Sequence, residues 1–179
     1  QGGWHIRESL NKRLNNPDFI LPVKDQNGSL SCGGQAWSTY GSVLESIHTG
    51  TFEERSAKFI YAQTFVPGGG SAGRTNCKLT HDQGFGTESL TSSYENGRPP
   101  HESYMQRAQD ITDPARYEAA HAKVYSYANV PLIIDDLAQA AESNHGLVLG
   151  ICGSNNGTWM KTQPIPPSYH ESIWRHWVY

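Results

Sequence analysis

The residues of this chain whose types and spacing suit chemistry stand just before an amphipathic run, where Gln26 precedes Cys32 across a loop rich in Gly and Ser. Beyond the loop, apolar residues recur at helical spacing at Ala36, Trp37, Tyr40, Val43, Leu44 and Ile47. This period predicts a helix with one buried face and with Cys32 at or just before its first turn. The unpaired N–H groups and the positive dipole end of a helix N-terminus favour a thiolate over a thiol. The pattern therefore predicts a nucleophilic cysteine.

The segment around Cys32 resembles the papain-like cysteine peptidases of the C1 type. Their signature is a Val-Lys-(Asn/Asp)-Gln segment, a Gly/Ser loop and a Ser-Cys pair that opens a long helix. Here residues 23–26 read Val-Lys-Asp-Gln and residues 31–32 read Ser-Cys. In this family the Gln donates to the oxyanion, the Cys is the nucleophile, and the backbone N–H of the Cys is the second donor. The resemblance therefore implies these roles for Gln26 and Cys32.

Two departures place the resemblance closest to prokaryotic and viral members of the family. Plant and lysosomal members have an aromatic residue directly after the Cys, where this chain has Gly33. They also have a second Cys three residues before the nucleophile, where this chain has Ser29, so their nearby disulfide is absent. We expect Ser31 and Gly33, which flank the nucleophile, to contact the substrate.

A glycine farther along is a candidate for pairing with an extended substrate. Papain-like enzymes run a Gly backbone past the substrate, and the segment at residues 82–87 resembles that one. Glycine suits this task because a side chain blocks close backbone approach. We expect Gly84 to be the pairing residue, with Gly86 as a neighbouring alternative. A tight turn before a helix at residues 88–94 explains both glycines equally well.

A cysteine peptidase needs an imidazole as base, and in papain-like chains it comes roughly 130 to 150 residues after the Cys. Both His170 and His176 lie in that window. His176 is followed by the apolar residues Trp177 and Val178, which resembles the strand that carries the family's catalytic His. A Pro-rich stretch at residues 164–167 matches the loop that prokaryotic members place before it. We therefore expect His176 to be the base, with His170 as its rival.

The two ends of the chain leave alternatives open. Family members continue past the His strand to an Asn that orients the imidazole, and this sequence stops at Tyr179. We expect the C-terminal segment that carries this Asn to be a second chain or an omitted segment. Otherwise the protein is short, and its base lacks an orienting group. The chain begins with Gln1 instead of Met, which fits either release from a propeptide (a zymogen) or trimming. The expected partners are a peptide or protein substrate and a propeptide or second chain.

Composition excludes several other classes. The net charge of −3 gives no reason to expect nucleic acid or an anionic membrane as a partner. No apolar run approaches the roughly 20 residues that span a bilayer. Of the 3 cysteines, Cys77 and Cys152 either pair, which suggests an oxidising compartment, or stay as buried free thiols. Cys77 and His81 have the spacing of two metal ligands on one helix face, but no second ligand pair follows, so neither a metal nor another cofactor is expected. A secreted or virion-associated location is slightly favoured over a cytoplasmic one.

The expected fold class is α+β, a papain-like two-lobe fold in a single domain over residues 1–179. A helical lobe over roughly residues 20–110 carries the nucleophile helix, and a β-rich lobe over roughly residues 111–179, with the N-terminal arm, carries the His. Ser56 is expected to cap a helix at 57–65, and Asp113-Pro114 to open another element. Residues 124–130 and 147–151 are expected as strands, with a short helix between them from Asp135 or Asp136 to Ala141.

The expected function is a cysteine endopeptidase that hydrolyses peptide bonds with Cys32, His176 and Gln26. One alternative is a catalytically weakened papain-like domain that acts as a binding or virion structural module. Another keeps the Cys-His chemistry but passes the acyl group to an amine, as transglutaminase-like enzymes do.

Overall fold

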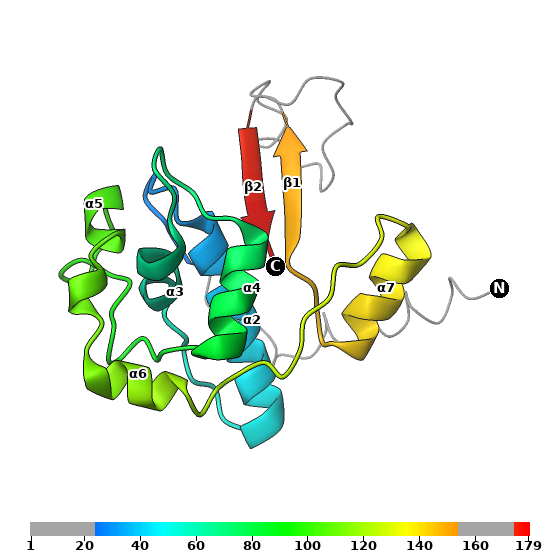
Figure 1. Cartoon of the computed structure of the whole chain (residues 1–179), viewed down its shortest axis with the longest axis horizontal. Coiled ribbons are helices and arrows are strands. Elements are labelled where there is room, and N and C mark those ends of the chain that lie inside the picture. Colours follow the sequence, from blue (N-terminus) through cyan, green and yellow to red (C-terminus); the bar gives the residue numbers. More distant parts are fainter. Residues whose placement is uncertain (1–23, 154–173) are drawn as a thin grey trace.

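The structure is a computed structural model that describes residues 24–153 and 174–179 (Figure 1). The predicted N-terminal arm up to residue 23, the Pro-rich stretch at 164–167 and the rival His170 lie outside the described residues. Within the described part, no helix is long and apolar enough to cross a membrane.

Helix α2, Cys32–Thr49, is the element against which the others pack, and it contacts α3, α4 and β2. It confirms the predicted helix, which begins at Cys32. Of the predicted apolar face, Ala36, Trp37 and Val43 are buried, Tyr40 and Leu44 are partly buried, and Ile47 near the end of the helix is exposed. Gly50 ends the helix in the left-handed conformation, with φ of 73°, and its N–H closes the last turn on the Ser46 carbonyl.

Helix α3, Ala57–Thr64, lies in the interior of the helical part. The predicted cap is confirmed, because the Ser56 side chain accepts the Phe59 N–H at 2.9 Å. Phe59 and Ile60 are fully buried and join Ala36, Trp37 and Phe85 in the main core cluster. The strong burial of so short a helix is consistent with packing, more than propensity, stabilising it.

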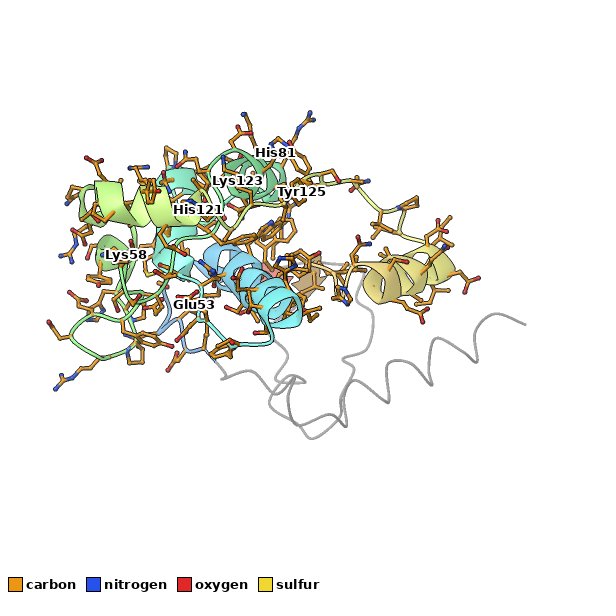
Figure 2. All side chains as sticks on the ribbon, turned by 90° about the horizontal axis from the view of Figure 1, so that it is seen from below. Glu53, Lys58, His81, His121, Lys123 and Tyr125 are labelled. Carbon is orange, nitrogen blue, oxygen red and sulfur yellow. The ribbon has the colours of Figure 1, made fainter. Side chains whose placement is uncertain are left out.

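Two buried cations tie this helical part together. The side chain of Arg55 is 2% exposed and forms ion pairs with Glu45 at 3.3 Å, Glu53 at 3.2 Å and Glu118 at 2.6 Å. The Lys58 side chain is 1% exposed, pairs with Asp110 and lies over a tyrosine ring. Glu53 and Lys58 are both on the helical side of the molecule, away from α7 (Figure 2). Buried charges are tolerated only when paired in this way.

Two predictions about local structure are wrong, and one helix was not predicted. The helix expected at residues 88–94 is wrong, because these residues form turns and bends. The Glu88 carboxylate accepts the Ser93 N–H and hydroxyl and the Ser92 hydroxyl, and such side-chain bonds compete with helix formation. The strand expected at 124–130 is also wrong, since this stretch has no strand pairing and Tyr125 is 98% exposed. Helix α4, Gly73–Asp82, was not predicted.

The remaining helices are short. They are α5 (Glu102–Met105), the 3-10 turn η2 (Ala108–Asp110), α6 (Asp113–Ala119) and α7 (Ile134–Ser143). The element expected at Asp113-Pro114 is α6, although its cap is Thr112, whose hydroxyl accepts the Ala115 N–H. Helix α7 confirms the helix expected near residues 135–141 and is set apart from the other helices in both views (Figures 1 and 2).

The described sheet is one antiparallel pair of strands, β1 (Leu149–Gly153) and β2 (Trp174–Val178). The expected strand at 147–151 is thus confirmed with its start moved by two residues, and β2 carries the predicted base. In the register, Ile151 faces His176 and Gly150 faces Trp177. The mixture of helices with a small sheet agrees with the expected α+β class. The two-lobe division and a β-rich lobe stay predictions.

Candidate active site

Cys32 is the first residue of α2, and the helix end around it is suited to an anion. The cap residue, Ser31, makes no side-chain bond to the first-turn N–H groups. Its hydroxyl instead pairs with the Ser29 hydroxyl at 2.7 Å. The first turn contains no acidic residue, and Cys32 is half-buried, so its thiol is accessible. Free N–H groups and the positive end of the helix dipole therefore lie at the position of Cys32.

The loop before Cys32, residues 26–31, is called here the oxyanion loop, after the role that the sequence resemblance predicts for Gln26. It begins with a tight turn in which the Ser29 N–H donates to the Gln26 carbonyl at 2.8 Å. The central residues, Asn27 and Gly28, have φ of 47° and 71°, and the Asn-Gly pair is favoured for such turns. One N–H of the half-buried Gln26 side chain donates to the Ser29 carbonyl at 3.0 Å. An amide nitrogen carries two protons, so the other N–H can donate to a ligand.

Lys24 fastens the start of this loop to the helical part. Its ammonium donates to the Ser38 hydroxyl of α2 at 3.0 Å and to the Arg55 carbonyl at 2.9 Å, and it pairs with Glu54 at 3.4 Å. Burial lowers the pKa of Lys24, and Glu54 opposes that shift. The lysine of the recognised signature thus holds in place the backbone that leads to Gln26.

Strand β2, which carries His176, packs on α2 through the neighbouring residue, Trp177. The Trp177 indole packs edge-on against Trp37 of α2, with 5.0 Å between ring centroids. Three glycines, from α2, α4 and β1, border the indole: Gly33, Gly73 and Gly150. A Cβ added at these positions would lie 3.4, 2.6 and 3.1 Å, respectively, from an indole atom. We call this arrangement the glycine slot.

In the glycine slot, Gly33, the residue after Cys32, packs against Trp177, the residue after His176. In the described structure, however, no hydrogen bond joins the Cys32 thiol to the His176 ring, and none orients that ring. Catalytic hydrogen bonds are often long without substrate and tighten in the complex. Burial lowers the pKa of His176, which favours the neutral imidazole that a base requires.

Ser71 and Asn76 join the two sides of the site, and the sequence analysis did not select them. The Ser71 carbonyl accepts the Trp177 indole N–H at 3.1 Å, and its hydroxyl accepts an amide N–H of Asn76 at 2.9 Å. Both side chains lie directly over Gly33, where an added Cβ would be 2.2 Å from the Ser71 Oγ and 2.7 Å from the Asn76 Nδ2. The nearest signal in the sequence is the three-glycine run just before Ser71.

The three residues expected to contact substrate are all buried. Ser31 is 0% exposed and its hydroxyl is bonded internally. Gly33 is covered by Ser71 and Asn76. At Gly84, with φ of 94°, an added Cβ would lie 1.8 Å from the Ala119 carbonyl oxygen. Each of these residues has a packing role, and its contact with a substrate stays a prediction.

The alternative Gly86 and the cysteine–histidine pair also have structural roles. An added Cβ at Gly86 would lie 2.5 Å from the Phe59 ring, so this glycine too is enclosed. Cys77 is a free thiol packed against the core, and burial raises its pKa. His81 is an exposed residue in the last turn of α4, on the same side as Tyr125 (Figure 2). Its Nδ1 lies 2.8 Å from an oxygen of the Asp82 carboxylate. The described residues contain no group of three or more side chains that could hold a metal ion.

Comparisons with known proteins bear on the fold. No protein-family model and no curated protein matches the chain. Among solved structures, it is similar to xylellain, a cysteine protease from Xylella fastidiosa, with a TM-score of 0.65 and 21% sequence identity. The similarity covers 89% of this chain and 64% of the xylellain chain, so the chain spans less than two thirds of that protein. This chain therefore has the fold of a cysteine protease.

Proposed function

We propose that this protein is a cysteine peptidase of the papain-like group, with Cys32 as nucleophile and His176 as base. One observation carries the proposal. The residue at the start of α2 is an accessible cysteine, and the glycine slot packs the strand with the histidine against that same end of the helix. The fold shared with a cysteine protease supports it.

The proposed reaction has two halves. The neutral His176 ring takes the thiol proton of Cys32 as the sulfur attacks the peptide carbonyl carbon. The protonated ring then gives this proton to the leaving amine, and an acyl-enzyme remains on the sulfur. In the second half, His176 takes a proton from water, the hydroxide attacks the acyl carbon, and the carboxylic acid leaves as the thiol is restored.

The oxyanion loop and the first residue of α2 each supply one stabilising donor of this mechanism. The free N–H of the Gln26 side chain and the backbone N–H of Cys32 would bind the oxygen that becomes negative in each tetrahedral intermediate. Removal of one such donor costs about 3 kcal/mol of transition-state stabilisation. Gln26→Ala should therefore lower kcat by about 100-fold and leave the KM similar.

Covalent labelling tests the proposal. The protein is treated with an epoxide inhibitor of papain-like enzymes, and the intact mass is compared for wild type, Cys32→Ala and His176→Ala. One adduct is expected on wild type, none on Cys32→Ala, and strongly slowed labelling on His176→Ala. Hydrolysis of a fluorogenic peptide library is measured in parallel. A wild-type protein that a simple maleimide labels but the epoxide does not would refute the peptidase assignment and leave a binding module.

Product analysis separates hydrolysis from acyl transfer. With hydrolysis, the acyl product is a free acid even when an amine is supplied in millimolar excess. An amide product under those conditions would show that the acyl group passes to amines in preference to water, and the assignment would change to an acyltransferase.

A further inference from the structure

Two loops meet beside Cys32, and they touch directly. One is the oxyanion loop, and the other is the turn at residues 66–70, called here the glycine turn. In the glycine turn, the Val66 N–H donates to the Gly70 carbonyl at 3.0 Å, and Gly68, Gly69 and Gly70 have φ of 92°, 93° and 81°. A Cβ at Gly69 would lie 2.0 Å from the Leu30 side chain. Only glycine fits this turn against the oxyanion loop.

A carboxylate and a phenol connect the same two loops by hydrogen bonds. The Glu102 Oε2 accepts the Leu30 backbone N–H at 2.6 Å, and its Oε1 accepts the Tyr61 hydroxyl at 2.6 Å. The Tyr61 oxygen in turn accepts the Gly70 N–H at 3.0 Å. The path from Leu30 to Gly70 therefore runs through two side chains that come from α5 and α3.

The described hydrogen-bond donors to the Glu102 carboxylate carry no charge. Its third donor is the Gln106 side-chain amide at 2.6 Å, and in the described part of the chain no cation forms an ion pair with it. Hydrogen bonds to an ionised acceptor are short and about twice as strong as neutral ones. Burial, and then the bond to Glu102, raise the pKa of Tyr61. The phenol therefore stays protonated, which fixes it as donor to Glu102 and acceptor from Gly70.

We propose that Tyr61 and Glu102 are a positioning pair that fixes the position of the oxyanion loop relative to Cys32. The glycine turn packs against the loop and is bonded to the same pair. This inference rests on the proposed function, because it concerns the oxyanion donors of that site. Leu30 lies between Gln26 and Cys32, so the bond to Glu102 fixes the segment that connects the two donors. Loss of the pair releases this segment without removing either donor.

The test compares two reactions of the same thiol. Peptide hydrolysis develops an oxyanion, whereas alkylation by iodoacetamide displaces iodide at a saturated carbon and develops none. Tyr61→Phe should lower kcat for peptide hydrolysis by 10- to 100-fold, with KM changed less than threefold and the alkylation rate changed less than twofold. Glu102→Gln should act in the same way, because Gln offers one acceptor where the two loops need two.

Tyr104→Phe is the matched control. The Tyr104 hydroxyl, also from α5, bonds to the Ser92 and Tyr94 carbonyls and touches neither loop. It should cost similar thermal stability and leave kcat unchanged. In a background of Gln26→Ala, Tyr61→Phe should have less than a third of its effect on kcat, since both changes act through the same donor. Equal kcat values for Tyr61→Phe and Tyr104→Phe would overturn the inference.

Amide exchange gives a readout that does not depend on activity. Tyr61→Phe removes the acceptor of the Gly70 N–H but leaves the Leu30–Glu102 bond formally intact. If the pair acts as a unit, exchange at Leu30 should also accelerate by more than tenfold, while Tyr104→Phe leaves it unchanged. Unchanged exchange at Leu30 contradicts the inference. If the wild type is inactive on peptides but Tyr61→Phe still accelerates exchange at Leu30, the result contradicts the proposed function and not the positioning pair.

Discussion

Replacement of Trp177 tests whether the glycine slot both stabilises the fold and places His176. A buried Trp→Ala change costs about 3–5 kcal/mol, and because Trp177 is half-buried we take about 2 kcal/mol for the lost packing. The lost indole bond to the Ser71 carbonyl adds about 1 kcal/mol. Trp177→Ala should therefore lower the free energy of unfolding by about 3 kcal/mol. For a chain of this length that corresponds to a fall in Tm of about 6–12 °C.

The same change should reduce activity even where the protein stays folded. Misplacement of a catalytic group by about 1 Å can cost about 100-fold, so we expect peptide hydrolysis by Trp177→Ala to fall by that factor at 15 °C. Trp177→Phe keeps one aromatic ring but loses the hydrogen bond and part of the packing, so between about 1 and 3 kcal/mol of stability and a smaller part of the activity should be lost. Urea denaturation and initial rates are measured on the same samples.

An exposed residue of the same strand is the control. Arg175→Ala shortens a solvent-facing side chain on β2 and should change neither quantity beyond about 0.5 kcal/mol or twofold. Normal activity in a Trp177→Ala protein that has lost about 3 kcal/mol would refute the positioning role. Unchanged stability would refute the packing argument itself.

Three further predictions concern pH, charge and backbone. Burial lowers the pKa of His176 below its ordinary 6.5, so the unfolded chain binds the proton more tightly than the folded one. The free energy of unfolding should therefore fall on acidification from about pH 6.5 downward. His176→Gln should flatten this slope in urea titrations, and an opposite slope would mean that the ring is charged in the native protein. Arg55→Leu leaves three carboxylates without their buried partner and should cost about 3–5 kcal/mol by thermal denaturation, whereas a cost under 1 kcal/mol would show that the network is not desolvated. Gly69→Ala should lower the free energy of unfolding by about 1–2 kcal/mol because of the positive φ of Gly69. Leu30→Ala in the same protein should relieve the clash with the Leu30 side chain but should not restore the stability lost to backbone strain. Full recovery of stability in the double variant would contradict the backbone contribution.

The sequence predicted best where one local signal decided the structure. The start of α2 at Cys32 followed from the apolar period, and the cap of α3 followed from Ser56. It failed where tertiary contacts decided. The residues at 124–130 favoured a strand, but no strand pairs with them in the described structure, and Tyr125 is 98% exposed.

The parts of the site that come from distant segments were not predictable. The roles of Ser71 and Asn76 depend on the approach of α4 to Gly33, which no local pattern reports. Glu102 reaches Leu30 across a long stretch of chain for the same reason. The helix wrongly expected at residues 88–94 has a different cause, because the Glu88 side chain bonds locally to Ser92 and Ser93 in place of the helix bonds.

The glycine slot also has a consequence for the order of folding. It joins residues near the two ends of the described chain, Gly33 and Trp177, whereas α2 and α3 are neighbours in sequence. Contacts between distant residues form slowly compared with local ones, because closing a long loop costs conformational entropy. An intermediate with its helices formed and β2 undocked has the thiol at the end of α2 but no base beside it. If Cys32 and His176 act as proposed, the chain cannot cut peptides, including its own unfolded copies, until this last contact closes.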